Sequence, residues 1–504
     1  MLFSFENLYR QYLRCRRNKR NTLNALRFEA RCEENLLALR EALVTRTYAP
    51  SRSVCFFAPG PKLRKIFAAD FCDRVVHHVL VDHLERIWEP LFIHDSYACR
   101  PGKGAHAAVR RLQTFIRQAS ANGTRRAWYL QLDIRNYFLS IDCDILFAQV
   151  AARLAGDGDA LWLAKVLIYH DCTELYLYRG PRGAYDRVPP HKTLFGAPKT
   201  KGLPIGNLNS QFFANVYLNG FDHFVKHTLK YRHYLRYCDD FVLLSPERGQ
   251  LIDWHERIAA YLRDALALEV NTKRTRLRPV SDGIDFVGYF VRREYLLVRR
   301  RVVSQLKVKL REYQTDLVRE GRNVRCCRFD GERLDTLFAT LCSYLSHSRM
   351  ASTYTLWRTL WERHPWLGQY FDFDPDARKL VRTYKAPRGF RRAVQQYRYY
   401  RWRFRGDVLL FQVGRFFEFY DTRDISIAQL LGLAPLGDNS RDARYGFPVR
   451  LVGRCLRTLL RTGRSVALVL ESKRYLTGVQ VRLPACRFEL VEKGRCSGIS
   501  DSPG

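Results

Sequence analysis

Several features that define large classes of protein are missing from this chain of 504 residues. No apolar run approaches the roughly twenty residues that cross a bilayer, so we expect no membrane partner. The start, Met1–Asn7, lacks a basic region followed by an apolar core, so we expect no secretion signal. The 14 cysteines are scattered and none form Cys-x-x-Cys, which favours reduced thiols in a cytoplasm over disulfides or a zinc site.

Acidic residues are scarce relative to basic ones. The chain has 85 Lys and Arg against 50 Asp and Glu, a formal charge of +35 and a pI of about 9.9. Such an excess requires a polyanionic partner, and without a membrane anchor nucleic acid is the favoured one. Because 47% of the residues are hydrophobic, the chain can bury real cores and form two or three domains.

One acidic pair, Asp239-Asp240, follows Tyr237-Cys238 between two β-prone runs. Residues 233–245 therefore read as a hairpin with both carboxylates at its tip. Neighbouring carboxylates repel each other, and a divalent cation such as Mg²⁺ removes this repulsion. The alternative for an isolated Asp-Asp dipeptide is a solvated turn.

A second acidic position lies far upstream, where Asp133 ends the apolar run 129–132. A lone aspartate at a strand end commonly caps the next element. A strand aspartate followed by a hairpin pair is also the arrangement in which carboxylates from two strands converge on two metal ions. We therefore predict Asp133, Asp239 and Asp240 as catalytic residues, and the same three with Ile134 as the site for two Mg²⁺.

Three segments in this order resemble successive motifs of reverse transcriptases: Asp133 with Phe138, Gly202–Gln211, and Tyr237–Asp240. The resemblance extends over residues 1–370 and implies a mixed α/β (α+β) right-hand polymerase with fingers, palm and helical thumb. It implies an RNA-directed DNA polymerase that binds an RNA template, a DNA primer or cDNA, and deoxynucleotide triphosphates. The source would be bacterial, archaeal or a phage.

The middle motif departs from the usual pattern. Most reverse transcriptases have Gln-Gly-x-x-x-Ser-Pro there, whereas this chain has Ile205-Gly206-x-x-x-Ser210-Gln211. That departure is characteristic of reverse transcriptases from diversity-generating retroelements, which copy a template-repeat RNA and misincorporate opposite adenines. Such enzymes often need an accessory protein, expected here to be small and basic. Ile205 is the candidate for relaxed nucleotide selection.

The resemblance also assigns substrate contacts. On a basic hairpin, Lys62 and Arg64 would hold the phosphates of the incoming nucleotide, with Lys65 as their rival. Phe138 would lie beneath the sugar and exclude a 2′-hydroxyl, with core packing as its alternative. The other predicted nucleotide contacts are Ile205, Gly206, Gln211, Lys273 and Arg274. The predicted primer or template contacts are Arg100, Lys103, Tyr237, Phe286 and Gly288.

The C-terminal part has a different composition. No acidic residue lies between Asp376 and Asp407, where Arg and Lys alternate with aromatic rings, a pattern that suits phosphates and bases. The following segment resembles the N-terminal, mismatch-recognising domain of the repair protein MutS. The Phe-x-Glu reader of that family falls on Phe416, which would stack on a mispaired base, and Glu418, which would bond to it. No Gly-x-x-x-x-Gly-Lys-[Ser/Thr] loop follows, so binding would not use ATP.

These resemblances predict five segments. They are the fingers and palm (1–300), a helical thumb (301–370), a basic linker (371–392), a small mixed α/β domain similar to MutS domain I (393–488), and a tail (489–504).

Three functions fit the patterns. The first is a polymerase of the diversity-generating type. The second is an antiphage-defence or other unclassified bacterial reverse transcriptase that uses the same site. The third is a non-catalytic nucleic-acid-binding scaffold. For the C-terminal domain by itself, the alternative to nucleic-acid binding is a small α/β module that serves protein contact. Full cDNA synthesis after replacement of Asp133 by Ala would place the chemistry outside the predicted site.

Overall fold

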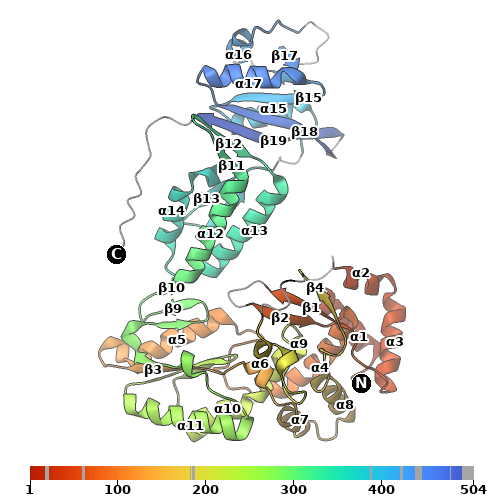
Figure 1. The fold of residues 1–504 in the computed structure, drawn as a ribbon, viewed down its shortest axis with the longest axis vertical. Helices are drawn as coiled ribbons and strands as arrows, with labels where there is room; N and C mark the ends of the chain where they lie inside the picture. The colour runs from red at the N-terminus through yellow and green to blue at the C-terminus, as the bar shows by residue number, and fades with distance from the viewer. Residues whose placement is uncertain are drawn as a thin grey trace. The chain divides into compact units, whose positions relative to one another are not determined.

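The computed structural model describes residues 1–17, 22–58, 63–181, 183, 188–385, 389–420, 424–436, 445–476 and 478–490. The chain, drawn in Figure 1, divides into two compact units, Met1–Leu296 and Leu297–Gly504. Each unit has its own buried hydrophobic side chains. Helices and strands are mixed in both units, which confirms the predicted mixed α/β fold class. No described helix is long and apolar enough to cross a bilayer.

The N-terminal unit begins with helices whose apolar faces pack into the main core. They are α1 (Phe5–Arg16), α2 (Leu23–Ala30), α3 (Cys32–Val44) and α4 (Phe71–Trp88). Asp70 caps α4, because its carboxylate accepts a hydrogen bond of 3.2 Å from the backbone nitrogen of Cys72.

A three-stranded sheet contains the predicted basic hairpin. Strand β1 (Ser53–Ala58) pairs antiparallel with β2 (Arg64–Ala68), which confirms the hairpin. Strand β4 (Tyr176–Arg179) adds to the other edge of β1 in parallel. A small buried cluster of side chains lies between the hairpin and this later segment. Side chains from residues 172–194, distant in the sequence, therefore pack against the hairpin.

The central element of the N-terminal unit is a four-stranded antiparallel sheet. Its strands, in spatial order, are β5 (Tyr234–Tyr237), β6 (Asp240–Ser245), β3 (Trp128–Asp133) and β7 (Arg276–Pro279). Side chains alternate between the two faces of a strand, so the leucines of β3 point into the main core while its polar residues share the opposite face. That opposite face carries the predicted carboxylates.

Seven helices complete the unit around this sheet. They are α5 (Ala105–Ala119), α6 (Tyr137–Ser140), α7 (Cys143–Ala151), α8 (Gly158–Ile168), α9 (Leu208–Tyr217), α10 (Asn219–His223) and α11 (Arg248–Leu266).

A short antiparallel hairpin follows the central sheet. It consists of β8 (Ile284–Phe286) and β9 (Tyr289–Val291), and β10 (Leu296–Val298) lies beside β9. Its turn is formed by Val287 and Gly288, with φ of +46° and +92°. Glycine suits the second position because it has no Cβ to strain a left-handed backbone.

The C-terminal unit begins with the segment predicted as a helical thumb. Three helices are present there, α12 (Arg300–Leu317), α13 (Gly331–Ser348) and α14 (Tyr354–Arg363), and their buried leucines and tryptophans share one core. Between the first two helices lies a hairpin of β11 (Val318–Glu320) and β12 (Val324–Arg328).

Residues 371–392, predicted as a basic linker, contain folded structure. Strands β13 (Phe371–Asp374) and β14 (Lys379–Arg382) form an antiparallel hairpin. Phe371 and Tyr384 are buried in the core of the thumb helices. Burial of these two rings stabilises the folded segment although many of its other residues are charged. The described part of the predicted linker therefore packs with the thumb.

The C-terminal sheet has seven strands in the order β11-β12-β19-β18-β15-β16-β17. The strands not yet located are β15 (Val408–Val413), β16 (Phe416–Phe419), β17 (Tyr445–Pro448), β18 (Val466–Leu476) and β19 (Val479–Leu490). Strands β15 and β18 are parallel, and the other named pairs are antiparallel. Strand β12 pairs with β19, so a hairpin from the thumb segment completes this sheet.

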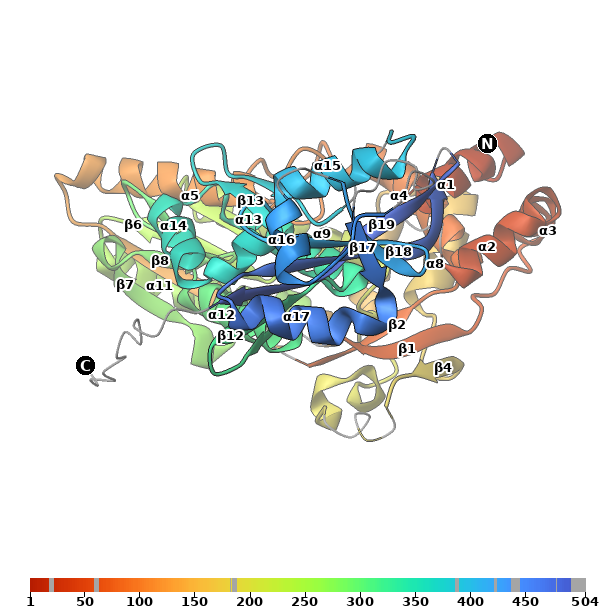
Figure 2. The ribbon, with the colours of Figure 1, turned by 90° about the horizontal axis from the view of Figure 1, so that it is seen from above.

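Helices cover both faces of the C-terminal sheet, as Figure 2 shows. Helix α15 (Ala393–Arg403) packs on one face, where Tyr397 and Tyr400 meet Phe411. Helices α16 (Ile425–Leu430) and α17 (Val452–Arg461) pack on the other. The domain is therefore a helix–sheet–helix sandwich.

Candidate active site

The central sheet brings Asp133 and Asp240 side by side. Strand β3 ends at Asp133 and the antiparallel strand β6 begins at Asp240, and the register pairs these two residues directly. The backbone nitrogen of Ile134 donates a hydrogen bond of 3.2 Å to the carbonyl of Asp239. Directly opposed residues in such a pair lie about 5 Å apart, on the same face. The predicted convergence of carboxylates from two strands is therefore present.

A two-residue turn places Asp239 at the tip of the hairpin. Tyr237 pairs with Asp240, so Cys238 and Asp239 alone form the loop. Cys238 has φ +58°, as the first loop position of a tight hairpin often requires. The sequence predicts both carboxylates at the tip, whereas Asp240 is the first residue of strand β6 because the turn is this short.

The environment of Asp239 raises its pKa. Burial is the larger cause and the nearby charge of Asp133 adds to it, while Arg64 of the basic hairpin acts in the opposite direction. Two carboxylates that repel each other in a partly dehydrated place, together with hard oxygen donors, suit Mg²⁺. The residues therefore fit a divalent cation. Within the described ranges, no three His, Cys, Asp or Glu side chains already lie in a metal-binding arrangement.

Each of the other two carboxylates has protein partners. Asp133 accepts hydrogen bonds from Asn271 at 2.9 Å and from Arg274 at 2.6 Å, and Arg274 is 45% exposed. Asp240 accepts one of 3.0 Å from the side-chain amide of Gln131. Arg274, predicted as a nucleotide contact, thus neutralises a predicted metal ligand in this state.

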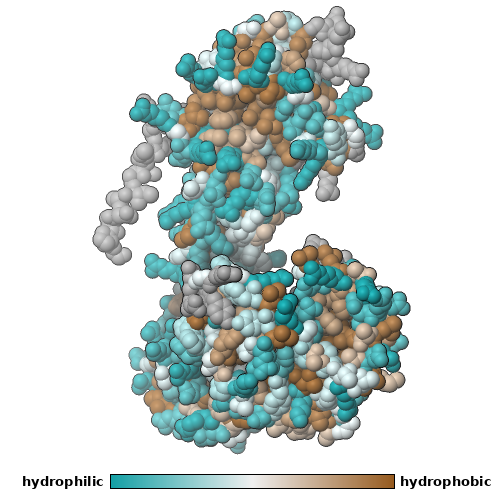
Figure 3. Space-filling model, turned by 45° about the vertical axis from the view of Figure 1, so that its right-hand side comes forward, coloured by the Kyte–Doolittle hydropathy of each residue, from teal (hydrophilic) through white to brown (hydrophobic). Residues whose placement is uncertain are grey.

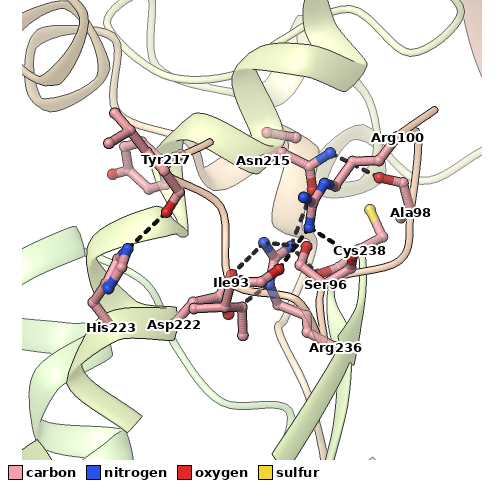
Figure 4. Close-up of polar contacts among 12 residues, drawn as sticks. Ile93, Ser96, Ala98, Arg100, Asn215, Tyr217, Asp222, His223, Arg236 and Cys238 are labelled. Atoms are coloured by element: carbon pink, nitrogen blue, oxygen red, sulfur yellow. Dashed lines mark hydrogen bonds and ion pairs between the residues drawn. The ribbon is translucent and has the colours of Figure 1, made fainter. Parts of the chain in front are cut away.

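A buried ion pair lies beside the turn that contains Cys238 (Figure 4). The side chains of Arg236 and Asp222 are both 0% exposed, and the nearest nitrogen–oxygen distance is 2.6 Å. Burial alone would lower the pKa of Arg236, but the charge and hydrogen bonds of Asp222 raise it above its ordinary value. Arg236 also donates to the backbone carbonyl of Cys238 at 3.1 Å. The turn that carries Asp239 is therefore held from inside.

The same guanidinium reaches two other segments. It donates to Ser96 at 3.1 Å and to Asn215 of α9 at 3.2 Å, and Asn215 donates to the carbonyl of Ala98 at 2.8 Å (Figure 4). With the bonds to Asp222 and Cys238, these contacts engage every nitrogen of Arg236. Arg236 thereby joins the β5–β6 hairpin to the loop predicted to contact the template.

In the predicted template loop, both cations form hydrogen bonds with other groups of the protein. Arg100 is buried and donates to Glu89 at 2.7 Å and to two backbone carbonyls. Lys103 donates to the carbonyl of His94 at 3.0 Å, and burial lowers its pKa. In this state both cations stabilise the loop rather than present free donors to a template.

The three cations predicted to bind phosphates on the basic hairpin differ in their surroundings. Lys62 lies outside the described residues. Arg64 is exposed and close enough to affect the charge of Asp239. The ammonium of Lys65 lies 5.1 Å from the ring centroid of Phe195 and 5.8 Å from that of Phe57. Of the described fingers residues, Arg64 is therefore one whose charge lowers the pKa of Asp239.

The motif with Ile205 and Gly206 is anchored on two sides. The carbonyl of Ile205 accepts a hydrogen bond of 3.2 Å from Phe67 of β2, and that of Phe138 accepts one of 2.7 Å from Leu203. Gly206 has φ +120°, and a Cβ there would lie 2.7 Å from a methyl of Ile66, so no other residue fits. The motif therefore links the fingers hairpin to the segment after Asp133.

The remaining predicted contacts vary in exposure. Gln211 and Lys273 are exposed, and Gln211 accepts a hydrogen bond of 3.5 Å from the Cys99 thiol. Tyr237 is half-buried, whereas Phe286 is fully buried in the β8–β9 hairpin. Phe286 can therefore shape this hairpin but cannot touch a primer in this state.

The predicted reader residues lie on the α15 face of the C-terminal sheet. Phe416 follows the turn at Gly414 and is 44% exposed. Glu418 accepts a hydrogen bond from Tyr420, and burial raises its pKa. Figure 3 shows hydrophobic side chains at the surface of this unit among hydrophilic ones, and Phe416 is one of its exposed large apolar residues. A stacking surface is therefore available, next to a partly buried carboxyl.

Three residues of the site were not predicted. Gln131 and Asn271 hold Asp240 and Asp133, and no sequence pattern distinguishes such amides from ordinary surface ones. Arg236 could have been found, because an arginine between apolar strand residues signals a buried partner.

Comparison with known families agrees with this geometry. Residues 59–291 match the family described as "Reverse transcriptase (RNA-dependent DNA polymerase)", and residues 391–485 match "MutS domain I". The chain is therefore similar to reverse transcriptases over residues 59–291 and to MutS domain I over residues 391–485.

Curated relatives extend the comparison. The chain is 24% identical to protein YkfC of Escherichia coli (strain K12), over 58% of this chain and 81% of YkfC. It is 21% identical to the group II intron-encoded protein LtrA of Lactococcus lactis subsp. cremoris, over 52% of this chain and 50% of LtrA. It is 32% identical to nuclear intron maturase 2, mitochondrial, of Arabidopsis thaliana, over 20% of this chain and 15% of that protein. The chain thus spans half or less of LtrA and the maturase.

Solved telomerases give only weak structural matches. Those of Candida tropicalis and Candida albicans have TM-scores of 0.35 with 12% and 11% identity. The matches cover 49% and 59% of this chain and 55% and 54% of the telomerase chains, too little likeness to support an inference.

Proposed function

We propose that this protein is an RNA-directed DNA polymerase whose chemistry takes place at Asp133, Asp239 and Asp240. The observation that carries the proposal is the register that pairs Asp133 with Asp240 beside the Cys238-Asp239 turn. Two Mg²⁺ bound there would stabilise the attacking and leaving oxygens as the primer 3′-oxygen bonds to the α-phosphorus and pyrophosphate departs. Asp133, Asp239 and Asp240, together with Ile134, would supply the hard oxygen ligands.

The protein's own residues would prepare this site. Arg236 holds the turn through the Cys238 carbonyl, which would keep Asp239 in place. Arg274 would leave Asp133 as the metal binds and would then be free to meet a triphosphate. Arg64 would approach the same phosphates from the fingers hairpin.

Primer extension tests the polymerase proposal. The purified chain is given an RNA template with an annealed DNA primer, deoxynucleotides and Mg²⁺, and we expect labelled cDNA that depends on the template. The same reaction without Mg²⁺ should yield none. Absence of extension on every primed RNA, with and without a cell extract that supplies accessory factors, would favour a nucleic-acid-binding scaffold instead.

The finer proposal is that the enzyme copies a template repeat with errors at adenines, as in diversity-generating retroelements. It rests on Ile205 in place of the usual glutamine. We expect Ile205→Gln to lower misincorporation opposite adenine by roughly two- to tenfold, because one hydrogen bond contributes about 1 kcal/mol. Sequencing of cDNA from a mixed-base template measures the rate.

The matched control is Ile205→Leu, which keeps an apolar side chain of equal size and should leave the error spectrum unchanged. If the parent copies adenines as faithfully as other bases, the diversifying role is wrong while the polymerase proposal survives.

A second candidate function is support of a group II intron. It is favoured by the relatives LtrA and intron maturase 2, both named for introns. Splicing assays with an intron found beside the coding region would distinguish this function from copying of a template repeat.

We further propose that the C-terminal domain reads distorted nucleic acid through Phe416 and Glu418. Exposure of the Phe416 ring supports the proposal. We expect Phe416→Ala to weaken binding of a mismatched duplex by about tenfold or more, since stacking of one base contributes about 1–3 kcal/mol. Fluorescence anisotropy with mismatched and matched duplexes measures the loss.

Leu430→Ala is the control, because Leu430 is 39% exposed but belongs to α16, on the opposite face of the same domain. Equal affinity of the parent and Phe416→Ala for the mismatched duplex would contradict the stacking role.

A further inference from the structure

Helix α17 and the residues just before and after it carry a single line of arginines. They are Arg450, Arg454, Arg457, Arg461 and Arg464, with spacings of four, three, four and three residues. This spacing keeps side chains on one face of a helix, and the opposite face buries Cys455 and Leu459 in the sheet core. We call these five residues the arginine line.

All five arginines of the arginine line are exposed. Among the described residues, none of them forms an ion pair with a carboxylate, and the side chain of Arg457 donates only to the backbone of Gly453 at 3.1 Å. The carboxylates of the sheet form ion pairs with other arginines. Asp407 pairs with Arg487 at 2.6 Å, and Glu471 pairs with Arg482.

Repulsion between these arginines destabilises helix α17. Like charges three or four residues apart repel by about 0.2–0.5 kcal/mol per pair. A merely solvated helix face would normally mix in glutamates, as α3 does with Glu33, Glu34 and Glu41. Uncompensated repulsion along the whole exposed face is relieved by a polyanion.

The dimensions fit a row of phosphates. With a rise of about 1.5 Å per residue, the three arginines within α17, Arg454, Arg457 and Arg461, lie about 5 Å apart and extend over about 10 Å, and Arg450 and Arg464 flank them. Gly453 lies within it, is exposed, and has no atom within 4 Å of where a Cβ would stand. Its bare backbone permits a partner to approach closely between Arg450 and Arg454.

The arginine line lacks the rings that bind unpaired bases. Its exposed face between residues 450 and 464 has no aromatic side chain, so stacking, the main source of single-strand affinity, is not available. A duplex instead presents a regular row of charge and needs no stacking. The predicted reader residues also belong to the other face of the sheet, where α15 packs (Figure 2).

We propose that the arginine line is a sequence-independent binding surface for the phosphate backbone of a nucleic-acid duplex. It is distinct from the polymerase site and from the Phe416–Glu418 reader. The proposal does not depend on catalysis, because a chain inactivated at Asp239 keeps α17 unchanged.

The test compares two triple variants of the full chain. In one, Arg454, Arg457 and Arg461 are replaced by Gln; in the other, the exposed Arg27, Arg31 and Arg40 of the N-terminal helices are replaced in the same way. Both lose three charges, and Gln preserves helix propensity. Anisotropy with a labelled RNA–DNA hybrid and with each single strand is recorded over a series of salt concentrations.

We expect the α17 variant to bind the hybrid at least about tenfold more weakly and to reduce the slope of log K against log salt by about 2–3, since each phosphate contact contributes about 0.9 for a duplex. The control variant should change the slope by less than about 1. Thermal unfolding checks that both remain folded.

Three outcomes would overturn the proposal. They are hybrid binding by the α17 variant with unchanged affinity and slope, an equal loss in the control, and a loss confined to the single strands.

Discussion

Asp239→Asn abolishes primer extension without lowering the unfolding temperature. We expect activity to fall by at least about a hundredfold, since a metal ligand stabilises charge that develops only in the transition state. The free energy of unfolding, in contrast to the activity, should not fall. The pKa of Asp239 is raised by burial and by Asp133, so its ionised form is disfavoured in the folded chain, and a neutral amide removes that cost at neutral pH.

Primer extension and differential scanning calorimetry on the same preparation measure both effects. Asp253→Asn on α11 is the matched control, because that carboxylate is 62% exposed and its ion pair with Arg257 lies at the surface. It should change neither quantity appreciably. Retained activity in Asp239→Asn would contradict the assignment, and so would a fall in unfolding temperature large enough to explain the lost activity.

The second large effect is expected at Arg236. Replacement by Gln leaves Asp222 buried without its counter-charge, and breaking such a pair costs about 3–5 kcal/mol in the free energy of unfolding. Urea unfolding of the parent and variant measures this loss. At a temperature where the variant remains folded, kcat for primer extension should fall more than the affinity for primed template, because the Cys238 carbonyl loses its donor.

A surface pair supplies the comparison for Arg236. Arg263 and Asp264 are 69% and 63% exposed, so Arg263→Gln should change the free energy of unfolding by less than about 1 kcal/mol. The double variant Arg236→Met with Asp222→Leu should recover part of the stability but not of kcat, since it removes the uncompensated charge without restoring the donor. Recovery of kcat in the double variant would show that Arg236 acts only through stability.

Local signals made part of this architecture predictable. The β-prone residues around Asp239 and Asp240 predict a hairpin, and the turn between β8 and β9 follows from Gly288. The proximity of Asp133 to that hairpin came from the order of motifs rather than from any local pattern. The registers of the central sheet confirm the hairpin around Asp239 and Asp240 and the position of Asp133 beside it.

Other features had no local signal. The parallel pairing of β4 with β1 joins segments separated by more than a hundred residues, and short mixed runs such as 176–179 suit many partners. Arg100 was assigned to a template because it lies in a glycine-rich loop. Its carboxylate partner, Glu89, comes from the preceding helix end, and only the folded backbone brings the two together.

The pairing of β12 with β19 imposes an order on folding. Strand β12 belongs to residues 324–328, but its neighbour comes from residues 479–490, near the end of the chain. During synthesis from the N-terminus, one edge of the β11–β12 hairpin must wait until almost the whole protein has left the ribosome. A chain cut between β12 and β19, for example after residue 370, would expose that edge permanently, and exposed strand edges template aggregation.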